Sequence, residues 1–213
     1  MRVLLVMLLL VGSAGFVLAQ SAATQGTDVQ SRIWRAFERR TAPQTDAWFK
    51  RGDFPRSVQL LEFRVALFPD NYEEVTNLAW LLESMEMTDQ TEAVLTEFYR
   101  QNPTMPDASF PIAHFHFRRN NYAETVRYLA PSIRMTPRPH PNTFRTLALA
   151  YERLGRLEEA IKVWDLMLSF MEDGAAVNNR ARVRQKLEER KEQTTPPSRL
   201  NDRSITLHRR WSA

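Results

Sequence analysis

The stretch Asn142–Met171, NTFRTLALAYERLGRLEEAIKVWDLMLSFM, decides the fold of this 213-residue chain. Apolar residues recur at helical spacing on both sides of Gly155, which is the pattern of two amphipathic helices joined by a tight turn. Small residues lie at Ala148 and Ala160, where two antiparallel helices must approach closely. Bulky residues that would fill the space between the helices lie at Tyr151, Leu157 and Trp164.

The same pattern recurs towards the N-terminus with a period of 34 residues. Pro69, Pro103 and Pro137 are each 34 residues apart, and proline ends a helix because it cannot continue the hydrogen-bond ladder. Counting back from these prolines predicts equivalents of four positions in the first stretch. The turn falls at Gly52, Glu86 and Asn120, the residue after it at Phe54, Thr88 and Tyr122, the small position at Ser57, Thr91 and Thr125, and the bulky position at Leu61, Leu95 and Leu129.

This spacing resembles the tetratricopeptide repeat, a helix–turn–helix unit of 34 residues. The resemblance covers about two-thirds of the chain and implies an all-α, right-handed solenoid of about four units. The expected units are residues 38–71, 72–105, 106–140 and 141–174, the third being one residue longer. The small position of the first helix is Ala79 or Ala113 in the middle units and Thr45 in the earliest one.

Two prolines depart from the repeat pattern. Pro43 and Pro111 fall inside expected first helices, and proline is tolerated only in the first turn. These helices are therefore predicted to start late, at about Pro43 and Pro111. Asp70 and Asp53 are predicted N-caps of the helices that follow them.

Segments outside the repeats are expected to close the two ends. Residues 20–37 combine a polar entry with a helix, Ser31–Arg40, in which Ile33, Trp34 and Phe37 are assigned to one face that covers the first repeat. Residues 175–195 are predicted to form a charged capping helix, because the last repeat of a solenoid needs a polar outer face. Residues 196–213 form a basic tail without periodicity.

The N-terminus has the pattern of a secretory signal. Arg2 is followed by an apolar run that ends in small residues at Val17 and Ala19, which predicts cleavage after Ala19 and a signal peptide of residues 1–19. An uncleaved membrane anchor is the alternative. We therefore expect export to the periplasm or the extracellular space. The sequence contains no cysteine, so disulfides and thiolate metal sites are excluded.

The resemblance also predicts a ligand-binding groove on the inner wall built by the first helices. Aromatic, arginine and lysine side chains there are the types that dominate binding hot spots. The alternative is that the aromatic residues pack between repeats. Carried over position by position, the predicted groove residues are Phe49, Lys50, Trp80, Glu83, Ser84, Phe110, His114, Phe117, Arg118, Arg145, Leu149, Glu152 and Arg153.

Catalytic and metal-binding motifs are missing from the sequence. His114 and His116 are two residues apart, so on a helix they point to nearly opposite sides, and His140 and His208 are isolated. The sequence has no HExxH, GxSxG or Gly-rich phosphate loop. We therefore expect no enzyme activity and no cofactor.

The expected function is that of a non-catalytic scaffold or adaptor that binds a peptide or helix of a protein partner in the groove. The alternative is a surface-attached structural module, which would contact anionic lipid or another polyanion through the basic C-terminal segment. That segment includes Arg209, Arg210 and Trp211, although glutamates are interleaved with its bases. Nucleic acid is not an expected partner, and the sequence leaves the partner and the oligomeric state open.

Overall fold

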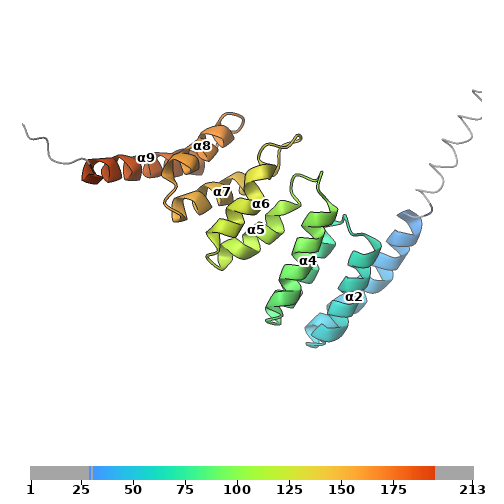
Figure 1. The fold of residues 1–213 in the computed structure, drawn as a ribbon. Coiled ribbons are helices and arrows are strands. Elements are labelled where there is room, and N and C mark those ends of the chain that lie inside the picture. The colour runs from blue at the N-terminus through green and yellow to red at the C-terminus, as the bar shows by residue number, and fades with distance from the viewer. Residues whose placement is uncertain (1–28, 30, 195–213) are drawn as a thin grey trace, which may run out of the picture. The chain divides into compact units, whose positions relative to one another are not determined.

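A computed structural model describes residue 29 and residues 31–194 of the chain. The predicted signal peptide and basic tail lie outside these residues. The described residues are helical with no strand among them, and they belong to two compact units that divide after Leu67. The all-α prediction is confirmed (Figure 1).

The first unit contains a helix over residues 31–50 and α2 (Phe54–Leu67), which lie side by side. The ring of Phe37 lies 5.8 Å from that of Phe63, and Glu38 pairs with Arg64 at 3.7 Å. At the other end of the pair, Phe49 meets Phe54 edge-on at 5.6 Å. The two helices therefore pack along their whole length.

The prediction that Pro43 starts a new helix is wrong, because residues 31–50 form one continuous helix. The expected cap and the expected first helix of unit one are therefore a single element. Contacts with α2 on both sides of Pro43 offset the local cost of the proline. Pro43 is exposed, so the carbonyl group that loses its N–H partner is open to water.

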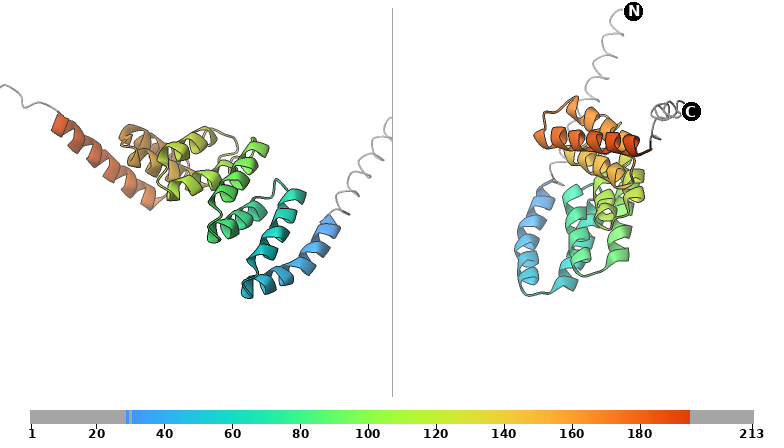
Figure 2. Two further views of the ribbon diagram at one scale, coloured as in Figure 1. Left: turned by 60° about the horizontal axis from the view of Figure 1, so that its bottom comes forward. Right: turned by 90° about the vertical axis from the view of Figure 1, so that its left-hand side faces the viewer.

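The second unit contains three antiparallel helix pairs and a final long helix. The pairs are α3 (Tyr72–Ser84) with α4 (Thr88–Gln101), α5 (Ser109–Arg118) with α6 (Tyr122–Ser132), and α7 (Pro141–Arg153) with α8 (Leu157–Leu168). Each pair packs on the next, and α9 (Gly174–Thr194) packs on α8 at the end of the row (Figure 2). This is the α-solenoid that the sequence predicts.

The four predicted turn positions share one backbone conformation. Gly52, Glu86, Asn120 and Gly155 have φ of 73°, 61°, 60° and 71°. In each turn the next residue donates its N–H to the carbonyl group five positions back, as in Asp53 to Trp48 at 2.9 Å and Met87 to Leu82 at 3.0 Å. These are the hydrogen bonds that close a helix through a left-handed residue. The predicted turns are confirmed.

The small and bulky positions are buried as predicted. Thr91, Thr125 and Ala160 have no exposed surface, and the bulky residues Leu95, Leu129 and Trp164 are at most 4% exposed. Thr91 and Thr125 donate their hydroxyl groups to carbonyl groups four residues back, at 3.0 Å in both cases. Both hydroxyl groups are thus satisfied within their own helices, and Thr125 also donates to the carbonyl group of Ala113 on the facing helix, at 3.3 Å.

Two helix starts differ in detail from the sequence analysis. Asn71, not Asp70, caps α3, because its side chain accepts hydrogen bonds from the N–H groups of Glu73 and Glu74 at 3.1 and 3.2 Å. Asparagine reaches these donors from the residue next to the helix, which is the position a cap must have. α5 begins at Ser109, so that Pro111 lies in the first turn, where its missing N–H costs nothing.

The last helix, α9, packs on the final helix pair. Val183 is fully buried against Leu157 and Ala160, and Leu187 packs at the edge of the same cluster. The basic side chains of α9 are tied to acidic residues of the preceding pair. Arg180 and Arg184 bind Asp165 at 2.8 and 3.1 Å, and α9 therefore closes the solenoid through both apolar and ionic contacts.

The turn geometry predicts opposite effects of glycine at two glutamates, one in the first turn of α3 and one in the turn after its end. Glu86→Gly should raise the free energy of unfolding by about 1 kcal/mol, because a left-handed φ strains any residue with a Cβ. Glu73→Gly, the matched control in the first turn of α3, should lower it by about 0.5–1 kcal/mol. Urea denaturation followed by circular dichroism measures both. Destabilisation by Glu86→Gly would contradict the assigned turn.

Candidate functional site

A hollow of about 280 Å³ lies between α3 and α5, with α4 behind it. The first helix of two successive pairs supplies most of its wall, which is the arrangement expected of a groove. Its lining residues are Tyr72, Thr76, Ala79, Trp80 and Glu83 from α3, Thr91 and Leu95 from α4, and Phe110, Pro111, His114 and Arg118 from α5.

A second hollow of about 320 Å³ adjoins the first and shares Tyr72 and Phe110 with it. Asp107, His140 and Asn142 complete its lining. The Asp107 carboxylate accepts a hydrogen bond from the backbone N–H of His140 at 2.7 Å. The two hollows form one groove, which runs from the C-terminal end of α3 to the start of α7 and which we call the α3–α5 groove.

Aromatic side chains form much of this groove. Trp80 is 57% exposed and Tyr72 is 36% exposed, although the Tyr72 ring also meets Phe98 edge-on at 6.1 Å. Phe110 is half-buried and stacks on His114, with ring centroids 5.4 Å apart. These rings offer apolar surface that a bound side chain could cover.

An ion cluster lies at one end of the groove. The Glu83 carboxylate of α3 accepts hydrogen bonds from Arg118 and, at 2.8 Å, from Arg119. Partial burial raises the pKa of Glu83, but the two guanidinium groups outweigh it and hold the pKa below its ordinary value. Glu83 therefore stays ionised and ties α3 to the end of α5, while half of the Arg118 side chain is exposed, at 49%.

The imidazole of His114 is an uncharged part of the groove lining. Burial lowers its pKa, and the nearby Arg118 lowers it further, against the opposing effect of Glu83. Its Nδ1 atom is buried without a hydrogen-bond partner among the described residues. An uncharged imidazole stacked on Phe110 therefore adds to the flat aromatic surface of the groove.

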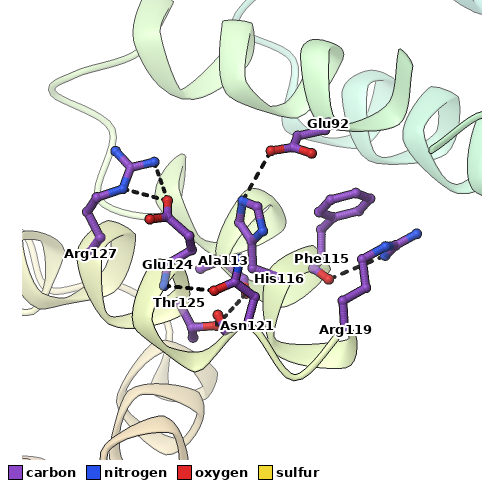
Figure 3. A network of polar contacts seen from close by, with 9 residues as sticks. All are labelled: Glu92, Ala113, Phe115, His116, Arg119, Asn121, Glu124, Thr125 and Arg127. Carbon is purple, nitrogen blue, oxygen red and sulfur yellow. Dashed lines mark hydrogen bonds and ion pairs between the residues drawn. The ribbon is translucent and has the colours of Figure 1, made fainter. Parts of the chain in front are cut away.

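His116 lies on the other side of α5 and belongs to a different set of contacts (Figure 3). It is 6% exposed, stacks on Tyr128 at 5.6 Å and faces Glu92 of α4 at 3.7 Å. Around it, Asn121 caps α6, and Glu124 accepts a hydrogen bond from Arg127 at 2.6 Å. This network joins α4, α5 and α6 and gives His116 a structural role.

Five of the predicted groove residues come together in the α3–α5 groove, whereas the others lie elsewhere. Trp80, Glu83, Phe110, His114 and Arg118 line it. Phe49 and Lys50 end the first helix of the other compact unit. Phe117 packs edge-on against Tyr122 at 5.4 Å, within its own helix pair.

The predicted residues of the fourth unit are held by neighbouring segments. Arg145 binds Asn142 at 2.7 Å and also binds Asp173, which precedes α9. Glu152 is 9% exposed and accepts hydrogen bonds from Arg182 of α9, one of them at 2.7 Å. Arg153 and Leu149 have no part in the hollows of the groove. Glu152, which the repeat pattern predicts to contact a ligand, therefore binds α9 instead.

The lining residues that the sequence did not predict as groove residues include Tyr72, Asp107 and His140. Tyr72 opens the second predicted unit, and a search that included the first position of each unit would have found it. Asp107 and His140 lie in the connections before α5 and α7. Their contact depends on loop conformation, which the helical register does not specify.

Other classes of site are not seen among the described residues. Residues 31–194 contain no group of three or more histidine or acidic side chains that could hold a metal ion. Within the same part of the chain, no helix is both long and apolar enough to cross a membrane.

No protein-family model matches the sequence, and no curated protein matches it. Solved structures of MamA, a tetratricopeptide-like helical solenoid, are similar in fold. A double mutant of MamA RS-1 gives a TM-score of 0.54 at 14% identity, covering 72% of this chain and 86% of that chain. MamA from Desulfovibrio magneticus RS-1 gives 0.53 at 14% identity, covering 72% and 87%. MamA MSR-1 gives 0.50 at 18% identity, covering 72% and 88%.

The chain has a tetratricopeptide-type fold. The similarity to MamA, the repeated turn geometry and the buried small positions all agree on this point. In a tetratricopeptide-type solenoid the α3–α5 groove occupies the inner wall, where the sequence analysis expects ligand contacts.

The lowered pKa values of His114 and His116 predict that mild acid destabilises the fold. Burial lowers the pKa of His114 and His116 in the folded chain, so the unfolded chain binds protons more readily. Stability should be complete above the unfolded pKa of about 6.5 and fall as the pH drops below it towards the folded values. The free energy of unfolding should therefore be lower at about pH 5.5 than at about pH 7.5.

The variant His114→Gln/His116→Phe tests this assignment. Gln cannot be protonated in this range, and Phe keeps the stacking on Tyr128. The variant should lose most of the pH dependence, whatever its stability at neutral pH. An unchanged slope of stability against pH would contradict the role of these histidines.

Proposed function

We propose that the tetratricopeptide-type unit of residues 68–194 is a non-catalytic interaction module that captures a segment of a protein partner in the α3–α5 groove. One observation carries the proposal. Trp80, Phe110, His114 and Arg118 come from two different repeats and line the same hollow. Aromatic and arginine side chains gathered in one concavity are typical of binding hot spots.

The chemistry of the groove supports capture rather than catalysis. Glu83 is held ionised by two arginines, and His114 has a lowered pKa. No nucleophile lies in a hydrogen bond to either group among the described residues. The groups that could transfer protons are thus engaged in packing and ion pairing.

The groove favours a partner segment with an apolar or aromatic side chain beside a carboxylate. The apolar group would fill the hollow against Trp80 and Phe110. The carboxylate would bind the exposed part of Arg118, which is only partly used by Glu83. Because both walls belong to packed helices, the site is largely preorganised and capture orders few side chains.

Photo-crosslinking in the producing cell tests the proposal. A photoreactive phenylalanine analogue in place of Trp80 should form a discrete adduct with a protein partner, identified by mass spectrometry. The same analogue at Val177, which is 43% exposed on α9, is the matched control and should form no such adduct. Adducts at Val177 but not at position 80 would contradict the assigned site.

Substitutions separate binding from folding. Trp80→Ala with Arg118→Ala should abolish partner capture and leave the helical circular dichroism nearly unchanged, because both side chains are about half exposed. Val177→Ala with Arg100→Ala removes an exposed apolar residue and an exposed arginine elsewhere. That control should keep full capture. If the groove variant unfolds instead, Trp80 and Arg118 serve the core and the groove assignment fails.

We further propose that capture takes place outside the cytoplasm. The support is the sequence pattern of residues 1–19, in which Arg2, an apolar run and small residues before Gln20 resemble a cleaved secretory signal. Mass spectrometry of the chain isolated from the producing cell should find an N-terminal peptide that begins at Gln20. A peptide that begins at Met1 would contradict cleavage.

A further inference from the structure

The first half of the helix over residues 31–50 has two faces of different character. Its inner face packs on α2, where Trp34 and Phe37 stack 5.3 Å apart and the Arg64 guanidinium lies 5.4 Å from the centre of the Trp34 ring. The prediction that Ile33 lies on this face is wrong. Ile33 is 64% exposed because it precedes Trp34 by one residue and points about 100° away around the helix.

The outer face carries an apolar stripe. Val29 is 50% exposed, Ile33 is 64% exposed, and Ala36 is exposed one turn further on. These positions are spaced by four and three residues, so they lie in one line along the helix. A line of exposed apolar side chains at this spacing is what an interfacial helix presents to a partner surface.

Arginines border this stripe. Arg32, Arg35 and Arg39 line the same depression as Val29, Ile33 and Ala36. Among the described residues, Arg35, Arg39 and Arg40 have no ion-pair partner. Glu38 is the one acidic residue described between positions 29 and 40, and it faces α2, where it pairs with Arg64. The outer face therefore carries cationic side chains, Arg35 and Arg39, that lack an ion-pair partner among the described residues.

The second basic helix of the chain, α9, differs in this respect. Arg180 and Arg184 are bound to Asp165, and Arg182 and Lys186 to Glu152. The buried residues of α9, Ala176 and Val183, pack inward. α9 also has an arginine without an ion pair among the described residues, Arg190, which donates to the Gly155 carbonyl group at 2.9 Å, and an exposed apolar residue, Val177. These two residues lie near opposite ends of α9. Of the two basic helices, the first is thus the one that gathers arginines lacking an ion pair and exposed apolar side chains in one place.

We propose that the outer face formed by Val29 and residues 31–40 binds an anionic lipid surface. Arginines beside a membrane are attracted by anionic headgroups, and Val29 and Ile33 would enter the boundary between headgroups and acyl chains. Charge complementarity alone would also suit a soluble polyanion. The apolar stripe favours lipid, since a polyanion offers nothing to cover Ile33. This site is independent of the α3–α5 groove.

The absence of cysteine from the sequence allows a direct test. Ile33→Cys in the full chain is labelled with an environment-sensitive nitrobenzoxadiazole dye and mixed with vesicles of equal parts phosphatidylglycerol and phosphatidylcholine. The emission should shift to the blue and become brighter. Pure phosphatidylcholine vesicles, which control for contact by the apolar N-terminal segment, should give little change. A dye at Val177→Cys on α9 should respond to neither.

Charge variants then locate the attraction. Arg35→Gln with Arg39→Gln should weaken the anionic-lipid response at position 33 roughly twenty-five-fold, at about fivefold for each arginine. Arg184→Gln with Arg190→Gln on α9 is the matched control with the same loss of charge, and it should leave the response unchanged. Raised salt should weaken the wild-type response.

Several outcomes would overturn the proposal. They are equal responses at positions 33 and 177, equal responses to neutral and anionic vesicles, and equal losses in the two charge variants. A dye response to soluble heparin, without any dye response to vesicles, would assign the face to a polyanion instead. None of these outcomes bears on crosslinking at Trp80, so the two proposals fail separately.

Discussion

The left-handed residue that closes each helix pair is the constraint on which the structure depends. At Gly52, Glu86, Asn120 and Gly155 the chain takes the same positive φ, and the next residue returns a hydrogen bond to the carbonyl group five positions back. Such a turn brings the second helix back along the first. The small buried residues Thr91, Thr125 and Ala160 then permit close approach. Because three of these turns lie in the second unit at nearly equal spacing, its first helices fall on one side and create the α3–α5 groove.

The sequence was informative where one residue type satisfies a local physical requirement. Turn positions and buried small residues could be read from the 34-residue period, since each depends on backbone conformation or close packing within one repeat. Pro43 could not be judged in this way, because contacts with α2 along the whole helix outweigh its local effect. For the same reason the boundary between the expected N-terminal cap and the first repeat is absent.

The candidate site was predicted in part, and the limit has a physical cause. Repeat register places Trp80, Glu83, Phe110, His114 and Arg118 on the inner side of their helices, and they meet in one hollow. The repeat pattern does not show which other side chains of the chain bind each of these residues. Glu152 is equivalent to Glu83, yet Arg182 of α9 binds it, as Arg118 binds Glu83. In both cases a carboxylate joins successive helices, and only at Arg118 does the pair border an open groove.

We propose that the α3–α5 groove is the surface on which a partner is captured. Hydrogen–deuterium exchange of the full chain, alone and in complex with the partner found by crosslinking, tests this claim most directly. Capture in the groove should slow exchange in Tyr72–Ser84 and Ser109–Arg118, with little change in Thr88–Gln101 and Tyr122–Ser132. Protection confined to Gly174–Thr194, or to Thr88–Gln101 and Tyr122–Ser132, would contradict capture in the groove.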